Sequence, residues 1–405
     1  MSGCEVAVVG AGIVGTAVAA ELAARGVDVV LLEAGEVSGG TTGLGEGNVL
    51  CGDKEPGPEL ELTLAGLGVF DELDAELGER ARVRRKGSLV VHPDPATWAA
   101  EPERVAALRA AGVEVELLEA AAVRAREPRL EGALYGAAFF PRDLQCDPRA
   151  IARALAARVP RVRTGCRAEA IAVADGRVAG VVTADRPLGA DAVVIAAGAW
   201  SRPLCEGAGL PLPLEPRWGQ LVRLAAPRDE PPWLTHKVVE GGYLASVASP
   251  GAGLQVTTVL ETTWERDVLV GSSRERRGFD LAAQPAVSAA MIARAARLAP
   301  GVRALPVAAS WAGLRPWLPD GRPAIGPSRA IPGLWVATGH EGAGVALGPI
   351  TGRVVAQALC GEPPAVDLAP FAPDRFVGDG PVVSAAAGKR AGAPTPATPP
   401  RGPGP

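Results

Sequence analysis

The sequence has few of the residues from which metal and redox centres are built. Its 405 residues include six cysteines, which lie far apart with no C-x-x-C pair, and three histidines, His92, His236 and His340. These shortages exclude a histidine-rich metal site and argue against a zinc site, an iron–sulfur centre or a redox-active disulfide. We therefore expect no metal site, and reduced cysteines that are mostly buried.

The sequence also lacks long apolar runs and an excess of basic charge. No apolar stretch approaches the roughly 20 residues that span a bilayer, and a strand begins almost at once, with no signal peptide before it. The 45 acidic and 41 basic residues give a net charge of -4, which provides no basic field for nucleic acid or an anionic membrane. We expect a cytoplasmic protein with no nucleic-acid partner and no integral membrane segment.

Glycine is plentiful, and the first glycines of the chain are regularly placed. An apolar run over residues 6–9 ends at Gly10, and Gly10, Gly12 and Gly15 form a G-x-G-x-x-G motif that opens an alanine-rich helix. A second apolar strand follows the helix, and Glu33 stands at its carboxyl end, 18 residues after Gly15. Strand, glycine turn, helix and acidic residue in this order are typical of a dinucleotide-binding unit.

Each part of this unit has a physical task. Gly10 permits the tight turn, Gly12 lets the backbone approach a pyrophosphate, and Gly15 lets helix and strand pack closely. The helix N-terminus attracts phosphate, while Glu33 can accept hydrogen bonds from a ribose. In a chain with 51 glycines the motif alone is weak, and a glycine turn without a ligand is the alternative. Its context favours a dinucleotide, but does not separate FAD from NAD.

The rest of the chain alternates between two kinds of pattern. Helical and apolar-strand patterns with glycine turns alternate with strand-rich stretches. The sequence predicts an α/β protein with a discontinuous Rossmann-like nucleotide domain and a second domain built on a mostly antiparallel sheet. The nucleotide domain is expected over residues 1–82, 145–210 and 306–378, and the second over 83–144 and 211–305. The Ala/Gly/Pro-rich tail, 379–405, is predicted to be disordered.

Five segments resemble the FAD-dependent D-amino-acid oxidase family. They are the N-terminal fingerprint, GGTTGLGEGN, VVIAAGAWS, WAGLRPWLPDGRPAIGP and LWVATGHEGAGVALGPITGR, in this order. Within the family, the chain looks most like glycine oxidase, the D-amino-acid dehydrogenases and the hydrogen cyanide synthase and opine oxidase subunits. The resemblance extends over nearly all of residues 1–375. It implies FAD rather than NAD, and an antiparallel-sheet substrate domain beside the FAD-binding domain.

The resemblance also implies which residues bind FAD. All of them lie in the fingerprint, in the early glycine loop or at later strand ends. Those for the ADP half are Gly10, Gly12, Ile13, Gly15 and Glu33, and those toward the flavin are Thr41, Thr42, Gly47, Asn48, Ala197 and Gly198. The segment along the isoalloxazine ring contains His340, Gly342, Ala343, Gly344, Val345 and Ala346. The helix that begins there would stabilise negative charge on the reduced ring.

The same resemblance implies the substrate-binding and catalytic residues. Arg315 matches the arginine that holds the substrate carboxylate, and a guanidinium suits this task because it makes two parallel bonds. Tyr243 is expected on a strand of the substrate sheet with its hydroxyl near the substrate, and core packing is the alternative. His340 is expected near the flavin, where a simple turn histidine is the alternative. No acid–base role is implied for it.

Two departures from the family pattern bear on the chemistry. Residues 310–321 contain no cysteine and residues 39–48 no histidine, so noncovalent FAD is implied. Leu269 stands where sarcosine-type oxidases present a lysine to the flavin. Fast reaction with oxygen is therefore in doubt, and the electron acceptor is oxygen, a quinone or a partner protein.

The sequence thus predicts an enzyme that oxidises the C–N bond of a small amino acid or N-substituted amino acid. Hydride would pass to flavin N5 while Arg315 orients the carboxylate, and the imine would hydrolyse to a 2-oxo acid. One alternative is a 2-hydroxy-acid dehydrogenase, which would need His340 or His236 as a base. Another is a flavin-binding subunit of a hetero-oligomeric complex. The exact substrate, its stereochemistry and homo- or hetero-oligomer formation stay open.

Overall fold

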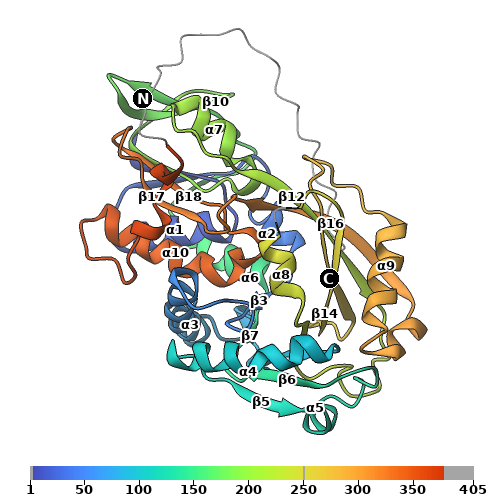
Figure 1. The fold of residues 1–405 in the computed structure, drawn as a ribbon. Helices are drawn as coiled ribbons and strands as arrows, with labels where there is room; N and C mark the ends of the chain where they lie inside the picture. Colours follow the sequence, from blue (N-terminus) through green and yellow to red (C-terminus); the bar gives the residue numbers. More distant parts are fainter. Residues whose placement is uncertain (1–2, 250, 378–405) are drawn as a thin grey trace.

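The computed structural model describes residues 3–249 and 251–377, and the tail 379–405 of the sequence prediction lies outside them. In the described part, the strands form two sheets of eight strands each and one sheet of two strands. The two large sheets form separate layers, one at the upper left of Figure 1 and one at the right and bottom. The predicted α/β class is confirmed.

The first sheet has the parallel centre that the N-terminal motif predicts. Its middle strand β1 (Cys4–Val9) pairs in parallel with β2 and β11, one on each side. The path across the sheet is β17 (Ala324–Pro327), β18 (Leu334–Thr338), β11 (Leu188–Ile195), β1, β2 (Val29–Leu32) and β8 (Arg161–Arg163). All four residues of β2 and five of the six of β1 are buried, which fits strands covered on both faces.

A hairpin extends this sheet from β11. It consists of β9 (Ala168–Ala174) and β10 (Arg177–Thr183). The turn between them contains Asp175 at φ 50° and Gly176 at φ 76°. An Asp-Gly pair between two alternating segments of the sequence predicts such a hairpin turn, and two successive residues with positive φ match its twist, so this prediction is confirmed.

Two parallel helices cover the centre of the first sheet. α1 (Ile13–Ala24) follows the fingerprint, and α10 (Gly344–Leu359) ends the last strand–turn–helix unit. A Cβ on Gly348 would lie 3.0 Å from Ile13, and one on Gly352 would lie 2.6 Å from the Ala17 Cβ. The two glycines therefore let the helix backbones approach closely. Because the contacts run in the same order along both helices, their positive N-terminal ends lie at the same edge of the sheet.

The second sheet is antiparallel except where β13 pairs with β4 in parallel. Its path is β16 (Val307–Trp317), β12 (Glu215–Leu224), β15 (Val268–Arg274), β14 (Gln255–Thr262), β13 (Lys237–Glu240), β4 (Ser88–His92), β6 (Gly136–Phe140) and β5 (Glu116–Glu119). The long strands β12 and β16 pair from Glu215 and Trp317 to Leu224 and Val307. The mostly antiparallel sheet that the sequence predicts is confirmed.

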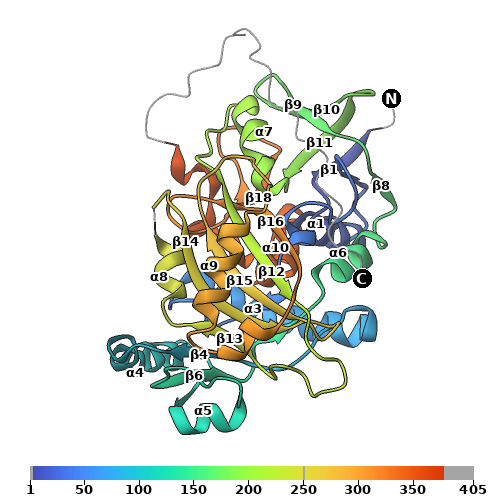
Figure 2. The same cartoon turned by 90° about the vertical axis from the view of Figure 1, so that its right-hand side faces the viewer.

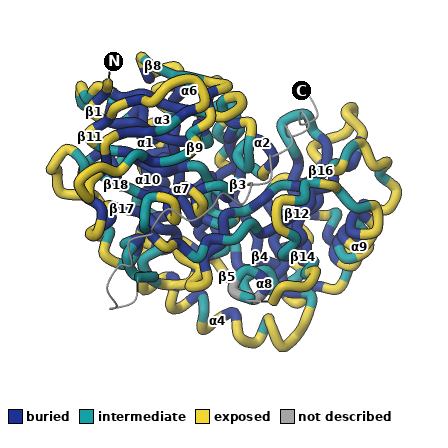
Figure 3. The backbone as a smooth tube through the Cα atoms, turned by 90° about the horizontal axis from the view of Figure 1, so that it is seen from above, coloured by how far each residue is buried: buried dark blue, intermediate teal, exposed yellow. Residues whose placement is uncertain are grey.

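Three helices cover this sheet. α9 (Pro285–Ala295) packs against β12, β14 and β15, while α4 (Pro95–Ala110) and α5 (Ala120–Arg126) lie beside β4, β5 and β6 at the bottom of Figure 2. In Figure 3 the buried residues follow the strands and the inner helices, and exposed residues surround them. The buried apolar residues form three clusters, and the largest contains residues of both sheets, for example Val8 and Val239.

Other elements lie in the stretches of chain that connect strands of different sheets. They are α3 (Pro58–Leu77), α6 (Pro148–Ala156), α7 (Ser201–Ala208) and the two-stranded sheet of β3 (Asn48–Val49) and β7 (Leu144–Gln145). Asp147 and Pro148 in the sequence predict the start of a helix, and the Asp147 carboxylate caps α6 by accepting hydrogen bonds of 3.0 Å from the N–H groups of Arg149 and Ala150. Within residues 3–249 and 251–377, no helix is long and apolar enough to cross a bilayer.

Three details differ from the sequence predictions. Tyr243 does not lie on a strand but begins the short helix α8 (Tyr243–Ala248), because the strand β13 ends before the turn at Gly241 and Gly242. The early glycine loop contains the short helix α2 (Thr41–Leu44). Strand β16 belongs to the second sheet, although a boundary at residue 306 would group it with the first. The remaining domain division stays a prediction.

Candidate active site

The fingerprint glycines bring two distant segments together. Gly10 has φ 106°, and a Cβ on it would lie 2.6 Å from the carbonyl oxygen of Ala196 and 3.0 Å from the Cα of Ala197. A Cβ on Gly15 would overlap the carbonyl oxygen of Gly10. The turn at Gly10 therefore packs closely against both α1 and the end of β11. This arrangement places Ala197 beside the fingerprint, as the sequence predicts for one nucleotide-binding edge.

Acidic and hydroxyl groups lie around the N-terminus of α1. The Glu33 carboxylate accepts hydrogen bonds from the N–H groups of Ala11, at 2.7 Å, and Gly35, at 2.8 Å. The Thr42 hydroxyl accepts one of 3.0 Å from the N–H of Ile13. A fixed carboxylate at the end of β2 can accept hydrogen bonds from a ribose, and the N–H groups of a helix N-terminus can donate to a pyrophosphate. These residues fit the ADP half of FAD.

The early glycine loop connects the two sheets. The Thr41 hydroxyl donates to the carbonyl oxygen of Leu314 on β16 at 2.6 Å, and the Trp311 Nε1 donates to the carbonyl oxygen of Leu44 at 2.9 Å. A Cβ on Gly47 would overlap the Cys146 carbonyl oxygen. Close packing therefore explains the glycine at position 47 without a ligand.

Asn48, at the end of this loop, also has protein partners. It pairs with Gln145 between β3 and β7, and its Nδ2 donates to the Glu46 carboxylate at 2.6 Å. Glu46 in turn pairs with Lys237 of β13, and Lys237 lies 3.5 Å from Glu261. Burial opposes the positive charge of Lys237, but Glu261 and Glu46 raise its pKa. Sequence reasoning missed this buried network, because its members lie far apart in the chain.

In the segment before α10, His340 and Gly342 lie in different surroundings. The His340 ring is buried, and its Nε2 lies 3.1 Å from the Thr351 hydroxyl. Burial lowers the pKa of His340 to about 3, so the ring is neutral near pH 7. A Cβ on Gly342, in contrast, would lie 3.8 Å from both the Arg315 Nε and the Tyr243 hydroxyl. The structure therefore brings Arg315, Tyr243 and Gly342 together and turns His340 toward α10.

The other predicted residues of this segment begin α10. Ala343 precedes the helix and donates its N–H to the His340 carbonyl oxygen at 2.9 Å, and Gly344 is the first helical residue. Val345 and Ala346 follow in the first turn and are buried. Gly198, in the turn after β11, has φ 53° and accepts a hydrogen bond from the Thr338 hydroxyl at 3.0 Å. That bond joins the end of β11 to the end of β18.

Arg315 is the arginine of this site that remains accessible. Its Nη1 donates to the carbonyl oxygen of Ser273 at 2.9 Å, which fixes the guanidinium, while 16% of the side chain stays exposed. Burial lowers the pKa of Arg315, and the nearby charge of Arg274 lowers it further. An arginine nevertheless stays protonated near pH 7 because its ordinary pKa is above 12. Arg315 can therefore offer N–H donors and positive charge to an anion.

Glu341 is surrounded by three arginines. One of its carboxylate oxygens lies 3.4 Å from Arg274, 3.6 Å from Arg217 and 4.0 Å from Arg315. Burial alone would raise the pKa of Glu341, but the three guanidinium groups lower it. The arginines come from the adjacent strands β15, β12 and β16, and Arg217 pairs directly with Arg315. Sequence reasoning missed Arg217, Arg274 and Glu341, because only the pairing of strands reveals their proximity.

Two further residues from the sequence predictions lie elsewhere. The His236 Nδ1 lies 2.7 Å from the Glu127 carboxylate, and its ring packs edge-on against Phe139. Leu269 lies on β15, buried, between Arg223 and Glu261 of the neighbouring strands. Among the described residues, no group of three acidic, histidine or cysteine side chains could hold a metal ion.

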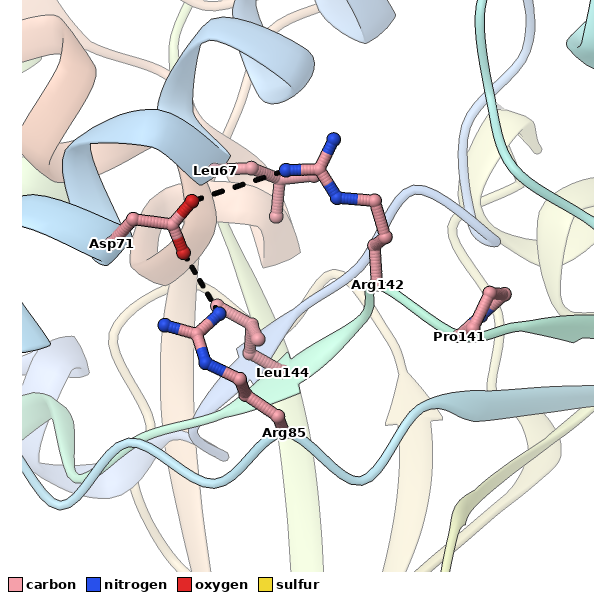
Figure 4. A pocket seen from close by; sticks show the side chains of 6 residues that line it. All are labelled: Leu67, Asp71, Arg85, Pro141, Arg142 and Leu144. Atoms are coloured by element: carbon pink, nitrogen blue, oxygen red, sulfur yellow. Dashed lines mark hydrogen bonds and ion pairs between the residues drawn. The ribbon is translucent and has the colours of Figure 1, made fainter.

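A surface hollow of about 250 Å³ lies away from these residues. Asp71 of α3 projects between Arg85, at 2.8 Å, and Arg142, at 3.9 Å (Figure 4). The lining residues are Leu67, Asp71, Arg85, Pro141, Arg142 and Leu144. Because its charges pair with one another and none of the predicted site residues line it, we do not assign this hollow to the active site.

The fold and the site together define a class of enzyme. One sheet is parallel and carries a dinucleotide fingerprint, and the other is mostly antiparallel and carries the partly exposed Arg315. This arrangement is typical of a dinucleotide-dependent oxidoreductase. The family model described as FAD dependent oxidoreductase, DAO, matches residues 5–358. The chain therefore belongs to the DAO family of FAD-dependent oxidoreductases, and the predicted family and cofactor are confirmed.

Relatives and solved structures agree with this assignment. The chain is 32% identical to a glycine oxidase of Pseudomonas putida, with 92% of this chain and 99% of the relative covered. It is 29% identical to a D-amino acid dehydrogenase of Cereibacter sphaeroides, with coverage of 76% and 68%. The crystal structure of glycine oxidase from Geobacillus kaustophilus has a TM-score of 0.84 and 28% identity, and covers 93% of this chain and 100% of its own.

Proposed function

We propose that this oxidoreductase oxidises the C–N bond of an amino acid or N-substituted amino acid to an imine, which water converts to a 2-oxo acid. The observation that carries the proposal is the position of Arg315. Its side chain is 16% exposed, and both its Nε and the Tyr243 hydroxyl border the side-chain-free position Gly342. Relatives named glycine oxidase and D-amino acid dehydrogenase support an amino-acid substrate.

The residues of the site divide the binding tasks. Arg315 holds the substrate carboxylate through charge-assisted hydrogen bonds and is itself fixed by the Ser273 carbonyl. Gly342 leaves room between Arg315 and Tyr243, since a Cβ there would meet nothing closer than 3.8 Å. The Tyr243 hydroxyl can then contact the amine or carboxylate of the substrate. When bound, FAD supplies the acceptor for the hydride, which carries both electrons of the oxidation.

The alternative oxidation of a 2-hydroxy acid requires a base for the hydroxyl proton. The contacts of both expected imidazoles argue against it. His340 contacts Thr351, and His236 contacts Glu127. An amine needs no such base, because its neutral lone pair assists the departure of the hydride. We therefore favour the amine, and a rate comparison between amino and hydroxy acids checks this choice.

The experiment that tests the proposal replaces Arg315 by lysine or alanine. Arg315→Lys keeps the charge but loses the two-pronged geometry, and loss of one charge-assisted bond of about 1.5–3 kcal/mol corresponds to roughly tenfold to a hundredfold in kcat/KM. Arg315→Ala should cost more. Flavin reduction is measured anaerobically against amino-acid concentration, with the flavin spectrum as a check on folding.

Arg276→Lys is the matched control. The Arg276 guanidinium lies 4.1 Å from the centre of the Trp317 ring, outside the Glu341 cluster. The Arg276→Lys variant should retain the wild-type rate of flavin reduction. If both Arg315 variants reduce the flavin with the wild-type rate and half-saturation, the carboxylate binds elsewhere and the proposal is wrong.

A further inference from the structure

Arg274 is a buried arginine with a spare hydrogen-bond donor. Only 1% of its side chain is exposed. Its Nη1 donates to the hydroxyls of Ser246, at 3.0 Å, and Ser272, at 3.2 Å, and its Nε lies 3.4 Å from Glu341. Its Nη2 has no hydrogen-bond partner within residues 3–249 and 251–377. A buried charged donor without an acceptor costs free energy and therefore indicates a ligand group that is to be bound there.

Arg217, in the same cluster, has hydrogen-bond acceptors for both of its terminal nitrogens and therefore serves as a structural comparison for Arg274. Its Nη1 donates to the carbonyl oxygen of Val247 at 2.9 Å, and its Nη2 to those of Ser246 and Ser249 at 3.1 and 3.0 Å. Both terminal nitrogens are thus used to hold the backbone around α8. The spare donor of Arg274 distinguishes it from Arg217, although both are buried and both face Glu341.

The Arg274 guanidinium lies close to the residues that surround Arg315. The Arg274 guanidinium carbon is 4.4 Å from the centre of the Tyr243 ring, whose hydroxyl shares the surroundings of Gly342 with Arg315. Burial lowers the pKa of Arg274 while Tyr243 and Glu341 raise it, but the Nη2 of Arg274 makes no hydrogen bond to either residue. Arg274 and Arg315 also share one oxygen of Glu341 within 4.0 Å. The two guanidinium groups therefore belong to one cluster around Glu341.

The charge of the cluster supports the same conclusion. The guanidinium groups of Arg217, Arg274 and Arg315 carry three positive charges, and Glu341 carries one negative charge. A substrate with a single carboxylate leaves positive charge uncompensated in a buried region. A second oxygen-bearing group on the substrate gives the spare donor an acceptor, and a second carboxylate also compensates the charge.

We propose that Arg274 is a second substrate-binding residue, which binds an oxygen-bearing group that the substrate carries in addition to its α-carboxylate. The substrates are then amino or imino acids with a carboxylate or hydroxyl on the side chain or the N-substituent. Glycine and alanine are poor substrates. That the substrate is an amine rests on the proposed function. That the site binds two oxygen-bearing groups does not depend on it.

Three non-oxidisable acids test the binding of the second group. Acetate has one carboxylate, methoxyacetate adds a neutral oxygen, and malonate adds a carboxylate. Each acid is titrated into the purified FAD-loaded enzyme while the flavin spectrum is recorded. We expect malonate, or malonate and methoxyacetate, to bind about tenfold to a hundredfold more tightly than acetate. Equal affinity for all three acids in the wild type overturns the proposal.

Variants assign the preference to Arg274. Arg274→Met should bring malonate and methoxyacetate to the affinity of acetate, and Arg274→Lys should keep part of the malonate preference through its charge. The matched control is Arg276→Met, two residues along the chain on the Trp317 ring, which should keep the wild-type preference. An unchanged preference in either Arg274 variant contradicts the proposal. The wild-type titration is decisive even if Arg274→Met does not fold.

A substrate panel separates this inference from the proposed function. Both enantiomers of alanine, serine and aspartate are tested for anaerobic reduction of the flavin. Faster reduction by serine or aspartate than by alanine supports both statements. Equal reduction by all three amino acids leaves the proposed function standing and contradicts the role of Arg274. If no amine reduces the flavin but malonate still binds more tightly than acetate, the proposed function is wrong and the second binding group stands.

Discussion

Gly219 is predicted to fix the position of Arg315 without any contact to the substrate. It lies on β12, directly opposite Gly313 on β16. A Cβ on Gly219 would lie 2.7 Å from the Arg315 guanidinium carbon, closer still to its Nη1, and 2.7 Å from the carbonyl oxygen of Ser273. The arginine is therefore stretched flat over a position that has no side chain, and it reaches Ser273 across it.

Gly219→Ala should displace this guanidinium. Carbon and nitrogen atoms that are not bonded prefer separations of about 3.5–4.0 Å, so the guanidinium carbon must move by about 1 Å and the closer Nη1 by more. A misplacement of about 1 Å in a group that positions a substrate can cost about a hundredfold in rate, or about 2.7 kcal/mol of transition-state stabilisation. We expect a loss of this order in kcat/KM for the substrate, with FAD still bound.

The assay is anaerobic flavin reduction against substrate concentration, with the thermal unfolding midpoint measured for each variant. Gly313→Ala is the matched control, because a Cβ there would meet only the Leu44 Cβ, at an ordinary 3.4 Å. It should keep wild-type kcat/KM. Wild-type kinetics in Gly219→Ala, or an equal loss in Gly313→Ala, would refute the reasoning that Gly219 positions Arg315.

Three further outcomes are expected. Acid precipitation should release FAD into the supernatant, because residues 310–321 have no cysteine and residues 39–48 no histidine, and colour left in the pellet would show a covalent flavin. Stopped-flow mixing of the reduced enzyme with oxygen should give reoxidation slower than with an artificial acceptor, because the sequence has Leu269 where the resemblance expects a lysine, and equal rates would contradict this. Burial raises the pKa of Asp143 to about 7, from about 3.9 in the unfolded chain, so its contribution to stability is present below pH 4 and is lost as the pH rises toward 7. Thermal unfolding from pH 4 to 8 should therefore show wild type losing stability relative to Asp143→Asn, and parallel curves would exclude this contribution.

Local patterns in the sequence were sufficient to predict most of the fold. The fingerprint depends on glycines and an acid within 29 residues, Glu5 to Glu33, and the hairpin turn at Asp175 and Gly176 depends on two adjacent residues. Tyr243 was placed on a strand because the surrounding stretch is rich in strands. The Gly241–Gly242 pair ends that pattern and allows α8 to begin. Short helices of this kind are decided by tertiary packing more than by their own sequence.

The candidate site was less predictable, because its charges come from separate strands. Arg315 was found through its motif, but Arg217 becomes its neighbour only through the register of β12 and β16. With 37 arginines among the 41 basic residues, composition alone could not indicate which ones are buried. The pairing of Glu46 with Lys237 was hidden for the same reason, since these residues are far apart in the chain and meet only across the glycine loop.

Glu341 links the cofactor side of the site to the substrate side. It immediately precedes the turn into α10, has φ 46°, and directs its carboxylate to arginines of three adjacent strands. Like charges that face each other across neighbouring strands repel, so the pair Arg217 and Arg315 requires a carboxylate between them. Any movement of the segment along which the flavin is expected to lie would therefore move the arginines that bind the substrate. The same carboxylate contacts only the Nε of Arg274. The Nη2 of Arg274 has no acceptor among the described residues, and it is the donor that the proposed second substrate group would bind.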